Sequence, residues 1–135
     1  MAAVVLGIGC DRGTSQETLA TAVAQCLTRA GLDYDAVHAL ATIDKKCDEP
    51  GLLALAEHLG VSLTFYTAEV LARVPVPNPS ATVMKHMGTP AVAEAAALLA
   101  AHAEPRDLII EKHKYRGADG KHATVSVARM NHESR

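Results

Sequence analysis

The chain of 135 residues is long enough for one domain around one hydrophobic core. Hydrophobic residues make up 49% of it and charged residues 21%, as in globular proteins, while an aromatic share of 3% argues against a nucleic-acid platform built on base stacking. The net charge of -2 excludes a long-range field that would draw the chain to nucleic acid or to a membrane surface.

The first half of the chain alternates strand and helix patterns. Residues 2–8 are an unbroken apolar run ending in glycines, which is typical of a strand buried on both faces of a parallel sheet. Thr14 and Glu17 have the spacing of a capping box, and the helix that they begin ends at Gly31. Similar patterns predict a strand over 37–43, a helix from Pro50 to Gly60, and a strand over 61–66.

The second half begins with a short predicted helix over 67–73 and a proline-rich stretch, 74–79, that must be extended. Thr89 and Pro90 predict the capped start of an alanine-rich helix that runs to about His102. Two strands follow, over 107–111 and 122–130, with a turn at 118–120.

This order of elements predicts an α/β fold with three layers, α/β/α. The sheet is expected to be mixed and mostly parallel, with about five strands and a C-terminal antiparallel hairpin. We expect residues 1–130 to form a single domain and residues 131–135 to be a frayed tail.

Cysteine and histidine spacing gives no metal site. The 3 cysteines form no C-x-x-C pair, and the 7 histidines show neither H-x-x-H nor H-E-x-x-H. We therefore expect no metal and no cofactor. No apolar run is long enough to cross a bilayer, and the N-terminus lacks a signal-peptide pattern, so we expect a cytoplasmic protein.

The segment from Gly7 to Gly13 is the best candidate for ligand binding, because open α/β sheets bind ligands at the carboxyl ends of their parallel strands. Glycines allow close approach of the backbone, the next helix offers free N–H groups, and Arg12 adds a cation. This pattern predicts an anion site, with a tight turn as the structural alternative. The spacing G-x-G-x-x-x-G misses the dinucleotide-binding pattern by one residue, so a nucleotide-binding module is a weaker alternative.

Two other loops carry candidate side chains. Lys46 follows the second predicted strand and is a further candidate for an anion contact, since the nearby Asp48 suits a helix N-terminus but the lysine does not. Asn78 and Ser80 end the proline stretch and either form a rigid rim over a pocket or only connect two elements.

The last candidates lie on the alanine-rich helix and beyond the fourth strand. Glu94 is expected to be an exposed helical glutamate, and the alternative is a carboxylate aimed at the sheet edge. Lys112 and Lys114 belong to a basic stretch that either is a solvated face or joins Arg12 in a cup for a ligand with several carboxylates.

Four motifs in one order carry a resemblance to a known family. The chain resembles the CobE/CbiG C-terminal domain family of cobalamin biosynthesis. The resemblance covers residues 4–130 and is weakest from Arg106 onward. The motifs are Gly-Ile-Gly-Cys-x-Arg-Gly-Thr (7–14), Ile-Asp-x-Lys-x-Asp-Glu-Pro-Gly-Leu (43–52), Pro-Asn-Pro-Ser (77–80) and Gly-Thr-Pro-x-Val-x-Glu-Ala-Ala-Ala (88–97). The chain resembles the stand-alone form of this family.

The resemblance implies a role in building the corrin ring, with a corrinoid or precorrin polycarboxylate as the ligand of an auxiliary or carrier protein. The two-domain relatives open a lactone on a cobalt-precorrin and release acetaldehyde, so a hydrolase or lyase is the alternative. The ligand-binding positions that the resemblance and the basic stretch select are Gly9, Arg12, Gly13, Thr14, Lys46, Asp48, Asn78, Ser80, Gly88, Glu94, Lys112 and Lys114.

No catalytic residue is assigned. Candidates are Glu94 or Asp48 as a general base, with Lys46 or Arg12 stabilising charge. Other enzymes of the pathway are candidate partners, docking near the prolines at 75–79, and neither nucleic acid nor a membrane is expected as a partner.

Overall fold

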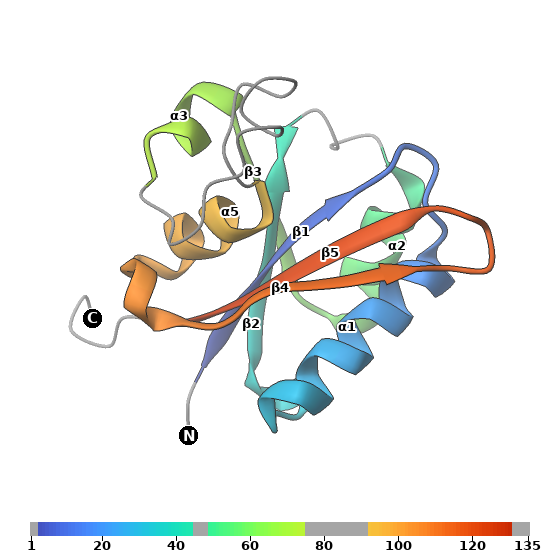
Figure 1. The fold of residues 1–135 in the computed structure, drawn as a ribbon, viewed down its shortest axis with the longest axis horizontal. Coiled ribbons are helices and arrows are strands. Elements are labelled where there is room, and N and C mark those ends of the chain that lie inside the picture. Colours follow the sequence, from blue (N-terminus) through green and yellow to red (C-terminus); the bar gives the residue numbers. More distant parts are fainter. Residues whose placement is uncertain (1–2, 45–48, 75–91, 131–135) are drawn as a thin grey trace.

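The computed structural model describes residues 3–44, 49–74 and 92–130, which form a five-stranded mixed sheet between two helical layers (Figure 1). The strand order is β3-β2-β1-β5-β4, in which β1, β2 and β3 are parallel and β5 runs antiparallel to both of its neighbours. The strands are β1 (Val4–Cys10), β2 (Val37–Ile43), β3 (Ser62–Tyr66), β4 (Leu108–Arg116) and β5 (His122–Arg129). The predicted α/β fold class is confirmed.

The helices divide between the two faces of the sheet. One face carries α1 (Gln16–Ala30) and α2 (Pro50–Leu59), and the other carries α3 (Ala68–Ala72) and α5 (Val92–Ala101), as Figure 1 shows. Short 3-10 turns at Tyr34–Ala36 and Pro105–Asp107 lead into β2 and β4. As the sequence predicts, α1 ends at Gly31 and α2 ends at Gly60, and both glycines have left-handed backbone angles.

Alternation along β1 separates two hydrophobic clusters. Leu6 and Ile8 point into the cluster under α1 and α2, whereas Val5 points into the cluster under α5. Each fully buried aliphatic side chain of this kind contributes about 1.5–3 kcal/mol relative to an exposed one. The α5 cluster relies on small alanines, so the helix backbone lies close to the sheet.

Gly7 is the point of closest approach between α5 and β1. A Cβ atom built there would lie 1.8 Å from the carbonyl oxygen of Ala93 and 2.8 Å from the backbone nitrogen of Ala97. No side chain larger than hydrogen fits without moving the helix. Gly7 therefore sets the position of α5 and, with it, the position of Glu94 in the first turn of that helix.

Three predicted details differ from the structure. The first strand continues through Gly9 and Cys10, because β5 pairs with both residues. The N-cap of α1 is Ser15 rather than Thr14, since the hydroxyl of Thr14 turns back to the carbonyl oxygen of Asp11 at 2.6 Å. The fourth strand extends to Arg116, so the basic stretch that was expected after the strand belongs to the sheet.

Candidate functional site

The β1–α1 loop, the leading candidate in the sequence, is bound to a carboxylate of the chain itself. The backbone N–H of Gly13 donates a hydrogen bond to Oε1 of Glu49 at 2.9 Å, and Nη1 of Arg12 lies 3.2 Å from Oε2. The Glu49 side chain is 4% exposed, whereas that of Arg12 is 66% exposed. Glu49 thus occupies the donors that were predicted to hold an external anion.

A second carboxylate binds the start of α1. Asp119, in the turn between β4 and β5, accepts hydrogen bonds from the backbone N–H of Ser15 and from Oγ1 of Thr18, both at 3.0 Å. These hydrogen bonds, together with one from the Lys121 backbone, lower the pKa of Asp119 to about 2. The hydroxyl of Ser15 accepts from the Thr18 N–H, so this end of the helix is closed by the fold's own groups.

On the opposite face of the sheet, the carboxylate of Glu94 is buried without such hydrogen bonds. Glu94 is 0% exposed, and neither of its carboxyl oxygens has a hydrogen-bond partner among the described residues. Nζ of Lys112 lies 3.3 Å from Oε1 and forms an ion pair from a side chain that is 29% exposed. The expectation of an exposed helical glutamate is wrong, because α5 carries its apolar residues on every side and packs against the sheet.

Burial dominates the electrostatics of Glu94. Desolvation raises the pKa of its carboxyl above the ordinary 4.5, Lys112 opposes that rise, and Glu111 adds to it. A buried polar group without a hydrogen bond costs about 1–3 kcal/mol, and an ionised one costs more. The arrangement is therefore costly for folding and is suited to receiving a partner from outside the described residues.

The pairing of the strands places further groups on the same face as Glu94. Gly7 faces α5, so Gly9, two residues later on β1, faces the same side. Thr124 of β5 is the register partner of both Gly9 and Lys114, so all three share that face. No described atom lies within 4 Å of a Cβ built on Gly9, so the described residues leave this position above β1 uncovered.

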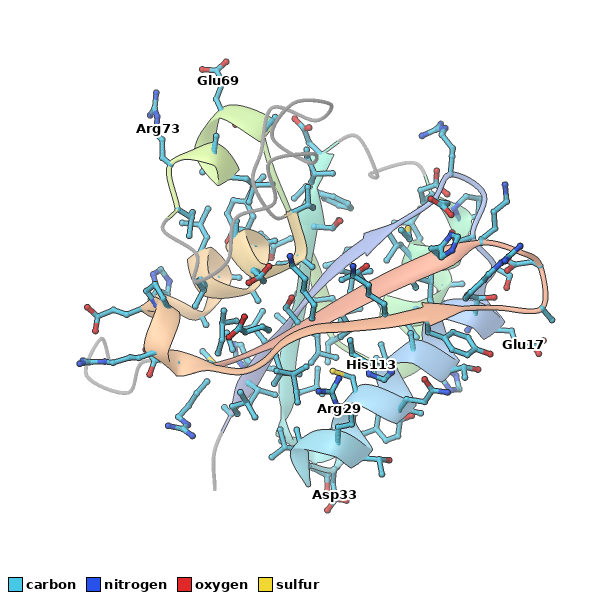
Figure 2. The ribbon with its side chains drawn as sticks, viewed as in Figure 1. Glu17, Arg29, Asp33, Glu69, Arg73 and His113 are labelled. Atoms are coloured by element: carbon cyan, nitrogen blue, oxygen red, sulfur yellow. The ribbon has the colours of Figure 1, made fainter. Side chains whose placement is uncertain are left out.

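The other side of β4 faces α1. His113 lies between Arg29 and Gln25 of that helix, with Nδ1 3.1 Å from Nη1 of Arg29 and Nε2 2.8 Å from Oε1 of Gln25; Figure 2 shows Arg29 and His113 side by side. Alternation then directs Lys112 and Lys114 to the α5 face. The basic stretch is therefore divided between the two layers and does not form one continuous cup with Arg12.

Of the residues selected in the sequence, four meet on the α5 face: Gly9, Glu94, Lys112 and Lys114. Arg12, Gly13 and Thr14 form the separate loop that holds Glu49 or turns back on itself. Thr124 was missed, since only the register of β5 reveals its position. Five candidates lie outside the described residues, namely Lys46, Asp48, Asn78, Ser80 and Gly88.

Within residues 3–44, 49–74 and 92–130, no group of three or more His, Cys, Asp or Glu side chains is placed to hold a metal ion. The helices in this part of the chain are all too short or too polar to cross a membrane.

Comparison with known families matches almost the whole chain. The family described as cobalamin synthesis G C-terminus matches residues 4–128. Protein CobE of a Sinorhizobium species is 35% identical over 129 residues, covering 94% of this chain and 80% of that protein. Cobalt-precorrin-5A hydrolase of Priestia megaterium is 34% identical over 125 residues, 93% of this chain, which spans only 32% of that hydrolase.

Solved structures give the same assignment of the fold. The crystal structure of CobE, a protein from the cobalamin biosynthetic pathway, aligns with a TM-score of 0.77 and 36% identity over 96% of this chain and 92% of that chain. The cobalamin biosynthesis protein chiG from Agrobacterium tumefaciens aligns with a TM-score of 0.67 and 30% identity, over 95% of this chain and 98% of that one.

Proposed function

Because the chain belongs to the CobE and CbiG C-terminal family of cobalamin biosynthesis proteins, we propose that it binds a precorrin or corrinoid polycarboxylate in the cytoplasm. In this role it holds an intermediate, or passes it to another enzyme of the pathway, without itself breaking a bond. The ligand class consists of flat macrocycles that carry many acetate and propionate groups.

The observation that carries the proposal is the buried carboxyl of Glu94, which has an ion pair with Lys112 through Oε1 and no hydrogen-bond partner at Oε2 among the described residues. Proteins seldom retain a buried polar group without a hydrogen bond unless a ligand supplies one. Lys112 and Lys114 provide positive charge for carboxylates on the same face, and the described residues leave the sheet at Gly9 uncovered for the approach of a planar ring. No other described region combines such an uncovered position with an unsatisfied buried group.

The five candidates outside the described residues are included in the proposal because of their positions in the sequence. Asp48 directly precedes Glu49 in the sequence, and Lys46 lies two residues before Asp48. Arg12 and Gly13 hold Glu49 beneath the first loop. Asn78, Ser80 and Gly88 belong to the segment that leads into α5. We assign these five residues to the same ligand, with Thr14 supporting the turn that Arg12 and Gly13 form.

Equilibrium dialysis tests this function. Cobyrinic acid, a corrin with free side-chain carboxyl groups, is the probe, and cobalamin, in which the corresponding groups are amides, is the control ligand. We expect micromolar binding of cobyrinic acid, little binding of cobalamin, and at least about tenfold weaker binding of cobyrinic acid to Lys112→Met. Arg106→Gln removes an exposed charge that pairs with Glu104 and is expected to bind like the wild type. Failure to retain cobyrinic acid, or equal retention of cobalamin, contradicts the proposal.

A precorrin hydrolase or lyase is the second candidate, favoured by the raised pKa of Glu94, which suits a general base or acid. In this mechanism Glu94 or Asp48 activates water, and Lys46 or Arg12 stabilises the developing charge. Glu94→Gln then abolishes turnover while binding survives. Full pathway activity of both Glu94→Gln and Asp48→Asn excludes the mechanism.

A nucleotide-binding module is the weakest candidate. Its glycine pattern includes Gly7, which the packing of α5 against β1 already requires. We expect neither NAD nor ATP at millimolar concentration to raise the melting temperature, and a clear rise with either nucleotide would revive this reading.

A further inference from the structure

Ligand binding on the α5 face brings a negative charge towards a carboxylate that is already buried. Glu94 lies opposite Lys112, the ammonium group to which a ligand carboxylate on this face is drawn. If Glu94 stayed ionised, its buried carboxylate and the ligand carboxylate would share one ammonium group, and their repulsion would oppose binding. A proton on Glu94 removes that repulsion.

We propose that Glu94 takes up one proton from solvent when a ligand carboxylate docks on Lys112. This inference rests on the proposed binding function, and it makes ligand affinity depend on pH through the protonation of Glu94. The uptake is balanced by the buffer: the ionised carboxyl becomes a carboxylic acid, Lys112 stays charged, and the ligand group stays a carboxylate.

The surroundings of Glu94 contain few other groups that could carry this proton. On α5 itself, Glu94 is the sole ionisable residue between Val92 and Ala101. From β4, Lys112 lowers and Glu111 raises the pKa of Glu94, and Lys114 lies on the same face without being an ion-pair partner of Glu94. From β5 the same face presents the hydroxyls of Ser126 and Thr124, and from β1 it presents glycines.

The other described elements packed against α5 add no charge at this position. On β2 the face under the helix is formed by Ala41 and Ile43, both buried. On β3 it ends at Tyr66, whose pKa burial raises, so that its phenol stays neutral near pH 7. The charged side chains of α3, Glu69 and Arg73, point away from the molecule in Figure 2. Glu94 is thus the group whose protonation a docking carboxylate changes.

Calorimetric titration with cobyrinic acid tests the inference. Repeated near pH 6.5 in buffers of different ionisation enthalpy, it measures the protons taken up on binding. We expect wild-type protein to take up more protons than Glu94→Gln, with a difference that approaches one where the pH exceeds the pKa of Glu94 in the free protein. The wild-type affinity should fall by up to about tenfold per pH unit above the pKa of Glu94 in the free protein, and the affinity of Glu94→Gln should stay flat.

Two further variants keep the test decisive. Glu94→Ala suits an alanine-rich helix and should also lose the proton uptake, which covers the case in which the glutamine variant folds poorly. Lys114→Met should weaken binding but keep the uptake, because Lys114 is not the ion-pair partner of Glu94. Equal proton uptake by wild type, Glu94→Gln and Glu94→Ala overturns the inference while leaving the binding function intact. Absence of binding at every pH overturns both.

Discussion

Glu49 and Glu94 are both buried carboxylates, one beneath the β1–α1 loop and the other between α5 and the sheet. Glu49 accepts a hydrogen bond from the Gly13 backbone and pairs with Arg12, so its burial is compensated within the fold. Glu94 has an ion pair with Lys112 and no hydrogen-bond partner among the described residues. Glu49 therefore connects two parts of the fold, whereas the burial of Glu94 costs folding free energy.

The two sides of the β1 end differ in whether their polar groups already have partners within the fold. A loop before a helix has the features of an anion site, yet in this chain the carboxylates of Glu49 and Asp119 already bind its donors. On the α5 face, the described residues give Glu94 an ion pair with Lys112 but no hydrogen bond, and none of them lies within 4 Å of a Cβ built on Gly9. Function is therefore better sought where polar groups are left unsatisfied than where their arrangement is already complete.

Moving α5 away from the sheet should have the largest effect. Gly7→Ala places a Cβ against the Ala93 carbonyl oxygen, so we expect a loss of about 3 kcal/mol in unfolding free energy and loss of ligand binding. Gly9→Ala is the matched control, since its added Cβ meets no described atom and its φ is not positive. Urea unfolding of the two variants measures the difference. Equal destabilisation by both would show that the helix does not rest on Gly7.

The order of strands and helices could be predicted because apolar runs end at glycines and prolines that stop each element. The burial of Glu94 could also have been inferred, since the helix around it is apolar on every side and so has no solvent face. The faces of Lys112 and His113 could not, because they depend on bulges and register in β4. Likewise, the cap that Asp119 gives to Ser15 joins residues 104 positions apart.

Acid titration of the loop region should have a smaller effect. Asp119 has its pKa lowered from 3.8 to about 2 by the Ser15 and Lys121 backbones, so the stability it contributes is present above pH 3.8 and is lost as the pH falls through about 2. We expect Asp119→Asn to be less stable than wild type near neutral pH. The two unfolding curves should converge in acid, and a constant gap down to pH 2 would contradict this role.

The smallest predicted effect concerns the α1 side of β4. Burial, and then the charge of Arg29, lowers the pKa of His113 below 6.5, so the unfolded chain binds the proton more readily. Stability should therefore decrease as the pH falls below about 6.5, and His113→Gln should remove that part of the decrease. Urea midpoints measured between pH 5 and 7.5 check the slope. An unchanged slope would place the titration on another group.

The unfolding free energy of Glu94→Gln and Glu49→Gln at pH 7 tests the central contrast most directly. We predict that Glu94→Gln is more stable than wild type, because an amide costs less to bury and Lys112 can reach solvent, and that Glu49→Gln is less stable by about 1 kcal/mol. Since the pKa of Glu94 is raised, the stability of its acid form is present below pH 4.5 and lost as the pH rises, so the gain should shrink towards pH 4.5. A loss of stability in Glu94→Gln comparable to that in Glu49→Gln would make Glu94 a structural ion pair and contradict the account.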